Sequence, residues 1–220
     1  MTLSQDLLTT HSRMWADLVG HDFFRLIEEQ KLPQTARDVY FLYERVFVDE
    51  AVVVFAHILS KATRLEGRRH LVSVLRGLVH DQVDLFDILL ARCGLPVEPV
   101  ARAECPAAVQ RLCDGMTELA RDGTYGDGLA AMFAAERSYL EVSRRIMAAG
   151  VGDAELDAWF RLHTEPPFTE GVAWLGREID RLGAAGATVF QLAPAFRRAT
   201  ALECDFHAAA LDAAPGVTLR

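Results

Sequence analysis

Residues 36–63 read ARDVYFLYERVFVDEAVVVFAHILSKAT, with no glycine or proline in the segment. Apolar residues recur in it near the 3.6-residue period of an α-helix. The apolar run 51–56 holds three adjacent valines, a composition that also suits a β-strand. Because this run lies inside a longer segment without a turn signal, we predict one long, buried helix.

The same helical period recurs in seven further segments, which are 3–18, 68–92, 106–121, 127–149, 153–164, 167–182 and 191–211. Short stretches with Gly or Pro separate them, as is typical of loops between helices. Asp127 and Asp153 stand where helix N-caps belong. We therefore predict an all-α bundle of seven to eight helices without a sheet, forming a single domain over residues 1–220.

Composition restricts the class of function. The chain of 220 residues has a net charge of −8, which argues against a nucleic-acid surface. Its apolar runs, such as 51–56, are far shorter than the roughly 20 residues that span a bilayer. The N-terminus does not resemble a signal peptide. Its 4 cysteines form no CxxC pair, so neither a disulfide scaffold nor a zinc ribbon is expected. We expect a cytoplasmic protein with no membrane partner.

A carboxylate followed three residues later by an aromatic residue occurs in three of the predicted helices. The pairs are Glu44 with Phe47, Glu136 with Tyr139, and Glu203 with Phe206; Tyr40 and Tyr43 lie on the stripe of the first pair. Residues three apart share a helix face, so each acid should follow its aromatic partner inward. Three converging acids predict a pocket with apolar walls for a small, flat ring that bears an amine. The alternative is that each acid lies at a helix flank and pairs with a nearby arginine, such as Arg45, Arg137 or Arg198.

Six short motifs, in order along the chain, resemble the TenA family, which includes the thiaminase II enzymes of the haem-oxygenase-like fold. They are HDFF at 21–24, YFLYE at 40–44, KA at 61–62, ERSYLE at 136–141, WFRLHTEPPF at 159–168 and LECDFH at 202–207. The resemblance implies a haem-oxygenase-like helical bundle, no cofactor or metal, and a homo-oligomer, either a dimer or a tetramer.

The resemblance also implies roles for particular residues. Glu203 falls on the family's catalytic glutamate, and Glu44 falls on the aspartate that holds the aminopyrimidine. Ala135 stands where the family has its cysteine nucleophile, so the covalent route is unavailable at that position. The chain therefore resembles the cysteine-lacking branch, which is linked to salvage of aminopyrimidine fragments of thiamin, with the acid Glu136 serving instead.

The resulting hypothesis is hydrolysis of a C–N bond in a thiamin-derived aminopyrimidine. Glu203 and Glu136 are the catalytic candidates and would divide the roles of acid and base. The substrate-binding candidates are Glu44, Phe47, Tyr43, Tyr139, His163, Phe206 and His80. His163, which replaces a pocket tyrosine of the family, is expected to assist proton transfer.

Two alternatives stay open. The same fold hosts di-iron oxidases, for which the candidate ligands are His80, Glu136, Glu203 and His207, but the H-x-x-x-D-x-x-H string that completes their site is absent. The second alternative is a non-catalytic relative that binds a small molecule, because several pocket positions differ from the family pattern.

Overall fold

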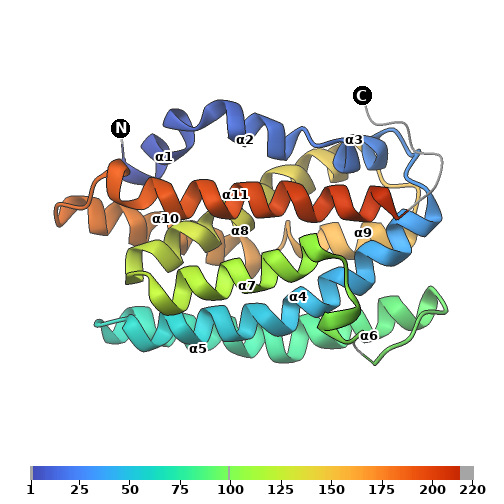
Figure 1. The fold of residues 1–220 in the computed structure, drawn as a ribbon, viewed down its shortest axis with the longest axis horizontal. Coiled ribbons are helices and arrows are strands. Elements are labelled where there is room, and N and C mark those ends of the chain that lie inside the picture. Colours follow the sequence, from blue (N-terminus) through green and yellow to red (C-terminus); the bar gives the residue numbers. More distant parts are fainter. Residues whose placement is uncertain (1, 99, 214–220) are drawn as a thin grey trace.

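The structure is a computed structural model that describes residues 2–98 and 100–213, and every regular element in these ranges is a helix (Figure 1). The α-helices are α1 Leu3–Thr10, α2 Ser12–Val19, α3 Asp22–Glu28, α4 Gln34–Lys61, α5 Leu65–Gly77, α6 Val83–Arg92, α7 Ala107–Asp122, α8 Tyr125–Ala149, α9 Ala154–Leu162, α10 Phe168–Ala184 and α11 Val189–Asp212. A π-helical turn, η1 Leu78–Gln82, joins α5 to α6, and a 3-10 turn, η2 Arg102–Glu104, precedes α7. The predicted all-α class is confirmed.

The helix boundaries differ from the sequence prediction in three places. Segment 3–18 is divided at His11 into α1 and α2, and segment 68–92 is interrupted by η1. The short helix α3 was not predicted, because it has too few residues to show a helical period. The apolar run 51–56 lies within α4, so the prediction of a buried helix there is confirmed.

The start of α8 also differs from the sequence prediction. Thr124 is the N-cap, and its hydroxyl accepts a hydrogen bond from the backbone N–H of Asp127. Asp127 is therefore the third residue of the helix, and its carboxylate accepts from the Thr124 backbone N–H at 2.7 Å, which completes a capping box. Asp153 caps α9 as predicted, accepting from the N–H groups of Glu155 and Leu156.

Helix α8 lies in the interior and packs against α4, α7, α9, α10 and α11 (Figure 1). Small residues fill much of its first half, which allows neighbouring helices to approach closely. A Cβ atom at Gly128 would lie 2.7 Å from Cγ1 of Ile58 on α4, so no larger residue fits there without movement. Among the described residues, no helix combines the length and apolarity needed to cross a membrane.

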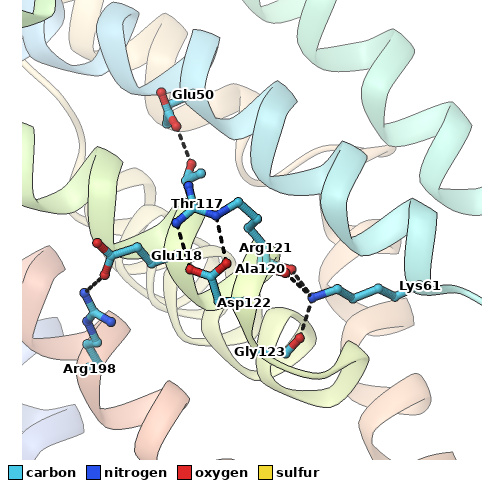
Figure 2. A network of polar contacts seen from close by, with 9 residues as sticks. All are labelled: Glu50, Lys61, Thr117, Glu118, Ala120, Arg121, Asp122, Gly123 and Arg198. Atoms are coloured by element: carbon cyan, nitrogen blue, oxygen red, sulfur yellow. Dashed lines mark hydrogen bonds and ion pairs between the residues drawn. The ribbon is translucent and has the colours of Figure 1, made fainter.

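Polar contacts fix α4 against α7 (Figure 2). Lys61, the last residue of α4, donates hydrogen bonds from Nζ to the carbonyl oxygens of Ala120 at 2.5 Å, Arg121 at 2.9 Å, and Gly123. These carbonyls lie at or just beyond the last turn of α7, where helix carbonyls have no partner within the helix. A cation there also interacts favourably with the helix dipole. Lys61 of the KA motif therefore has a structural role in joining two helices.

We expect Lys61→Met to lower the free energy of unfolding by about 1–3 kcal/mol, because it leaves partly buried carbonyls without a donor. Urea denaturation followed by circular dichroism measures the change. Lys31→Met is the matched control: Lys31 is exposed and pairs with Glu29 at 3.0 Å, so its loss should cost less than about 1 kcal/mol. Equal losses for the two variants would contradict this role of Lys61.

Candidate functional site

The three carboxylates of the acid–aromatic pairs line one internal cavity of about 40 Å³. Glu44 comes from α4, Glu136 from α8 and Glu203 from α11. The side chains of Glu44 and Glu203 are buried, and that of Glu136 is half-buried. The remaining lining residues are Phe47, Val48, Ala51, Leu78, Gln82, Met132, Ala135, Tyr139, Trp159, His163 and Phe168. The cavity is thus mostly apolar, with acids from three helices.

Six of the nine predicted site residues line this cavity, and three do not. Tyr43 is half-buried elsewhere, because one residue of helix separates it from Glu44 by about 100°. Phe206 is buried but packs against Tyr40 and His207, with ring centroids 6.2 and 5.4 Å apart. His80 is exposed on η1, so its predicted place in the pocket is corrected.

The arginines proposed as partners of these acids are engaged elsewhere. Arg45 pairs with Asp49 at 2.5 Å, and Arg198 pairs with Glu118 at 2.5 Å. Arg137 lies 3.7 Å from Glu141. The alternative in which the three acids form flanking ion pairs with these arginines is therefore wrong.

Burial dominates the electrostatics of the three acids. It raises the pKa of Glu44 to about 7, an effect that hydrogen bonds from Tyr139 and Tyr40 partly offset. Burial, with repulsion from Glu44, raises the pKa of Glu136 to about 8. Burial and repulsion from both other acids raise the pKa of Glu203 well above its ordinary value. The Oε1 atom of Glu203 is buried and has no hydrogen-bond partner among the described residues.

A hydrogen-bonded network lies behind Glu44. The Tyr139 hydroxyl is hydrogen-bonded to Oε1 of Glu44, and it lies 3.1 Å from the Tyr40 hydroxyl and 3.2 Å from Nε2 of His207. Trp159 donates its indole N–H to the Tyr40 hydroxyl at 2.8 Å. Sequence reasoning did not place Tyr40 or Trp159 in the site, and it considered His207 only as a candidate iron ligand. Helical spacing was the available signal, because Tyr40 precedes Glu44, and His207 follows Glu203, by four residues.

Two buried histidines in this region are neutral. His163 donates Nδ1–H to the carbonyl of Trp159 at 2.8 Å and stacks on Tyr139, with ring centroids 5.0 Å apart. Burial lowers the pKa of His163 to about 4 and that of His207 to about 3. His163 therefore does not change charge near neutral pH, contrary to the reason given for its expected role.

A second cavity of about 150 Å³ adjoins the first. The two share Leu78, Gln82, Glu136 and Phe168 as lining residues. Leu78 and Gln82 are the first and last residues of the π-helical turn, an irregularity found often at functional sites. Glu136 thus lines both the inner cavity and this outer one.

No cysteine is among the residues that line the inner cavity, and Ala135 stands there instead. The four cysteines lie elsewhere, and burial raises the pKa of Cys113 and of Cys204 to about 12. A thiol with a raised pKa is a poor nucleophile at neutral pH.

The four residues considered as iron ligands do not form one cluster. His80 is exposed on η1, whereas Nε2 of His207 faces the Tyr139 hydroxyl. Within residues 2–98 and 100–213, no three His, Cys, Asp or Glu side chains are grouped so that they could hold a metal ion.

Comparison with known proteins agrees with this architecture. The model of the TENA/THI-4/PQQC family matches residues 8–213. The chain belongs to this family. No curated protein matches it.

Solved structures of TenA homologues share its haem-oxygenase-like helical fold. The TenA homologue from P. horikoshii OT3 is 20% identical, with a TM-score of 0.88 over 97% of this chain and 100% of that one. A TenA homologue from Pyrococcus furiosus is 14% identical, with a TM-score of 0.86 over 94% and 99% of the two chains. A putative TenA-like thiaminase from Sulfolobus solfataricus P2 is 14% identical, with a TM-score of 0.80 over 97% and 98%.

We expect Glu203→Gln to stabilise the protein more at pH 9 than at pH 5. The folded state holds a proton on Glu203 that the unfolded carboxyl releases, because burial raises its pKa. The stability that Glu203 contributes is therefore fully present at low pH. It is lost as the pH rises through the pKa that Glu203 has in the folded state. Glutamine does not titrate and escapes this loss. The difference in melting temperature, variant minus wild type, should therefore be at least about 3 °C larger at pH 9 than at pH 5. The exposed Glu66→Gln is the control, and an equal change there would contradict the prediction.

Proposed function

We propose that this TenA-family protein is a hydrolase or salvage enzyme that acts on a C–N bond of a thiamin-derived aminopyrimidine, with carboxyl groups in place of a cysteine nucleophile. It would then belong to the cysteine-lacking branch of the family. The observation that carries this proposal is the cavity in which Glu44, Glu136 and Glu203 meet, where Oε1 of Glu203 is buried without a partner. A buried polar atom without a partner is costly, and a bound ligand with N–H groups would satisfy it.

The walls suit a planar heteroaromatic ring. Phe47, Tyr139, Trp159 and Phe168 line the cavity and offer aromatic surfaces against which such a ring can stack. The acids supply acceptors for an exocyclic amino group, and Glu44 is proposed to hold that group. Ligand sites commonly combine apolar walls with a few placed polar groups in this way.

The hydrolysis divides into two proton transfers. Water forms a new C–O bond and gives one proton to a base, while the C–N electron pair leaves with the amine, which takes a proton from an acid. Glu203 is proposed as the acid, because its burial and the repulsion from both other carboxylates favour the protonated form. Glu136 is proposed as the base, because it also lines the outer cavity from which water arrives.

We expect Glu203→Gln to lower the rate of hydrolysis of a 4-amino-5-aminomethylpyrimidine by at least about 100-fold, because glutamine cannot supply the proton. Ammonia release and formation of the hydroxymethyl product are measured by chromatography. Glu118→Gln is the control, because Glu118 is a surface residue paired with Arg198, and it should keep the wild-type rate. Unchanged turnover in Glu203→Gln would discard the assignment.

The same ligand distinguishes the enzyme from a relative that only binds. A ligand present at 100 times its dissociation constant stabilises the folded state by about 2.7 kcal/mol. A higher melting temperature without product would identify a binding protein. The single domain over residues 1–220, the cytoplasmic location and the homo-oligomer stay predictions.

A further inference from the structure

The Tyr139 hydroxyl has more hydrogen-bond partners than protons. It contacts Oε1 of Glu44, the Tyr40 hydroxyl and Nε2 of His207, all in the buried interior. A phenol carries one proton and accepts through its oxygen lone pairs. At most one of the three contacts is therefore donated by Tyr139, and the other two need a proton from the partner.

Trp159 and His207, the last members of the network on either side, determine where most of these protons lie. Trp159 is only a donor, so its N–H points at the Tyr40 oxygen and leaves the Tyr40 proton for another acceptor. His207 Nδ1 lies 2.6 Å from the backbone carbonyl of Glu203, which only accepts, so Nδ1 carries the imidazole proton. The ring is neutral because it is buried, and Nε2 of His207 is then an acceptor.

The protonation state of Glu44 decides how many protons remain for the three contacts of Tyr139. With Glu44 ionised, only Tyr40 and Tyr139 supply a proton, so one of the three contacts lacks one. Either Nε2 of His207 is left without a donor in a fully buried place, or Tyr40 donates to Glu44 and the close contact between Tyr139 and Glu44 holds no proton. With Glu44 protonated, Glu44 donates to Tyr139, and Tyr139 donates to His207. Only a protonated Glu44 supplies a proton to each of the three contacts, and buried polar groups strongly favour such satisfaction.

We infer that His207 is a positioning residue that acts through Tyr139 to hold Glu44 in its protonated form, so that this carboxyl meets a ligand as a neutral group. The inference rests on the proposed function only for the identity of the ligand.

The other titratable groups near these residues either disfavour a charge on Glu44 or are uncharged. Glu136 on α8 and Glu203 on α11 face Glu44 across the cavity, and a charge on either disfavours a charge on Glu44. His163 and Tyr40 are buried and uncharged at neutral pH. The half-buried His21 ring lies 5.9 Å from the His207 ring, and burial lowers its pKa as well.

The test uses the full chain without substrate, so its outcome is separate from that of the hydrolysis assay. Protein labelled with ¹³C at the glutamate carboxyl is titrated by NMR, and Glu44→Gln assigns the signal. In the wild type we expect Glu44 to titrate well above the usual range of a glutamate carboxyl, because burial raises its pKa. In His207→Phe, Tyr139 is free to donate to Glu44, and the proton affinity of Glu44 should fall by about tenfold or more.

Two matched variants separate this effect from a change in packing. His207→Gln supplies an amide oxygen that accepts from Tyr139, and it should restore most of the wild-type titration. His80→Gln alters an exposed histidine outside the network and should change nothing. The inference is overturned if the pKa of Glu44 in His207→Phe is the same as in the wild type or higher.

A measurement on the wild type covers the case in which His207→Phe does not fold. The ¹⁵N resonance of His207 Nε2 reports whether this nitrogen accepts a hydrogen bond. We expect the hydrogen bond to be present below the titration of Glu44 and lost above it, with one shared midpoint. An Nε2 resonance that stays constant while Glu44 ionises overturns the inference.

Discussion

Three carboxyl groups held in one apolar enclosure, with the nearby arginines paired elsewhere, are the constraint on which the site depends. In water each group would ionise and be hydrated, but inside the bundle the charged form is strongly disfavoured. Raised pKa values for Glu44, Glu136 and Glu203 are the direct consequence. The free protein therefore favours protonated carboxyl groups in this cavity.

The helical framework makes this arrangement rigid. The acids come from α4, α8 and α11, and α8 packs directly against both others. Close approach at Gly128 and the bonds from Lys61 to the end of α7 fix α4 relative to its neighbours. The departure from regular helix at the π-helical turn occurs where the inner and outer cavities share lining residues.

The sequence predicted the fold class and much of the cavity lining, because both depend on helical period. Glu44 with Phe47, and Glu136 with Tyr139, reach the same cavity, as a spacing of three residues implies. The third pair fails because a step of three residues leaves a rotation of about 60° between side chains, and on α11 this turns Phe206 toward Tyr40. His80 was misplaced, because it lies on the π-helical turn with its side chain exposed. The contacts of Tyr139 with Tyr40 and His207 join three helices, and no local pattern in the sequence specifies how those helices approach one another.

The two neutral histidines near the cavity hold their imidazole proton in the same way. Each donates Nδ1–H to the carbonyl four residues earlier, which leaves Nε2 as an acceptor. The cavity region therefore combines acids that hold protons with imidazole nitrogens that cannot supply one. A ligand that fits such a set must both accept and donate hydrogen bonds within a small planar frame. A ring with endocyclic nitrogens and an exocyclic amino group meets that requirement, whereas an apolar ring or a simple alkyl amine satisfies only half of it.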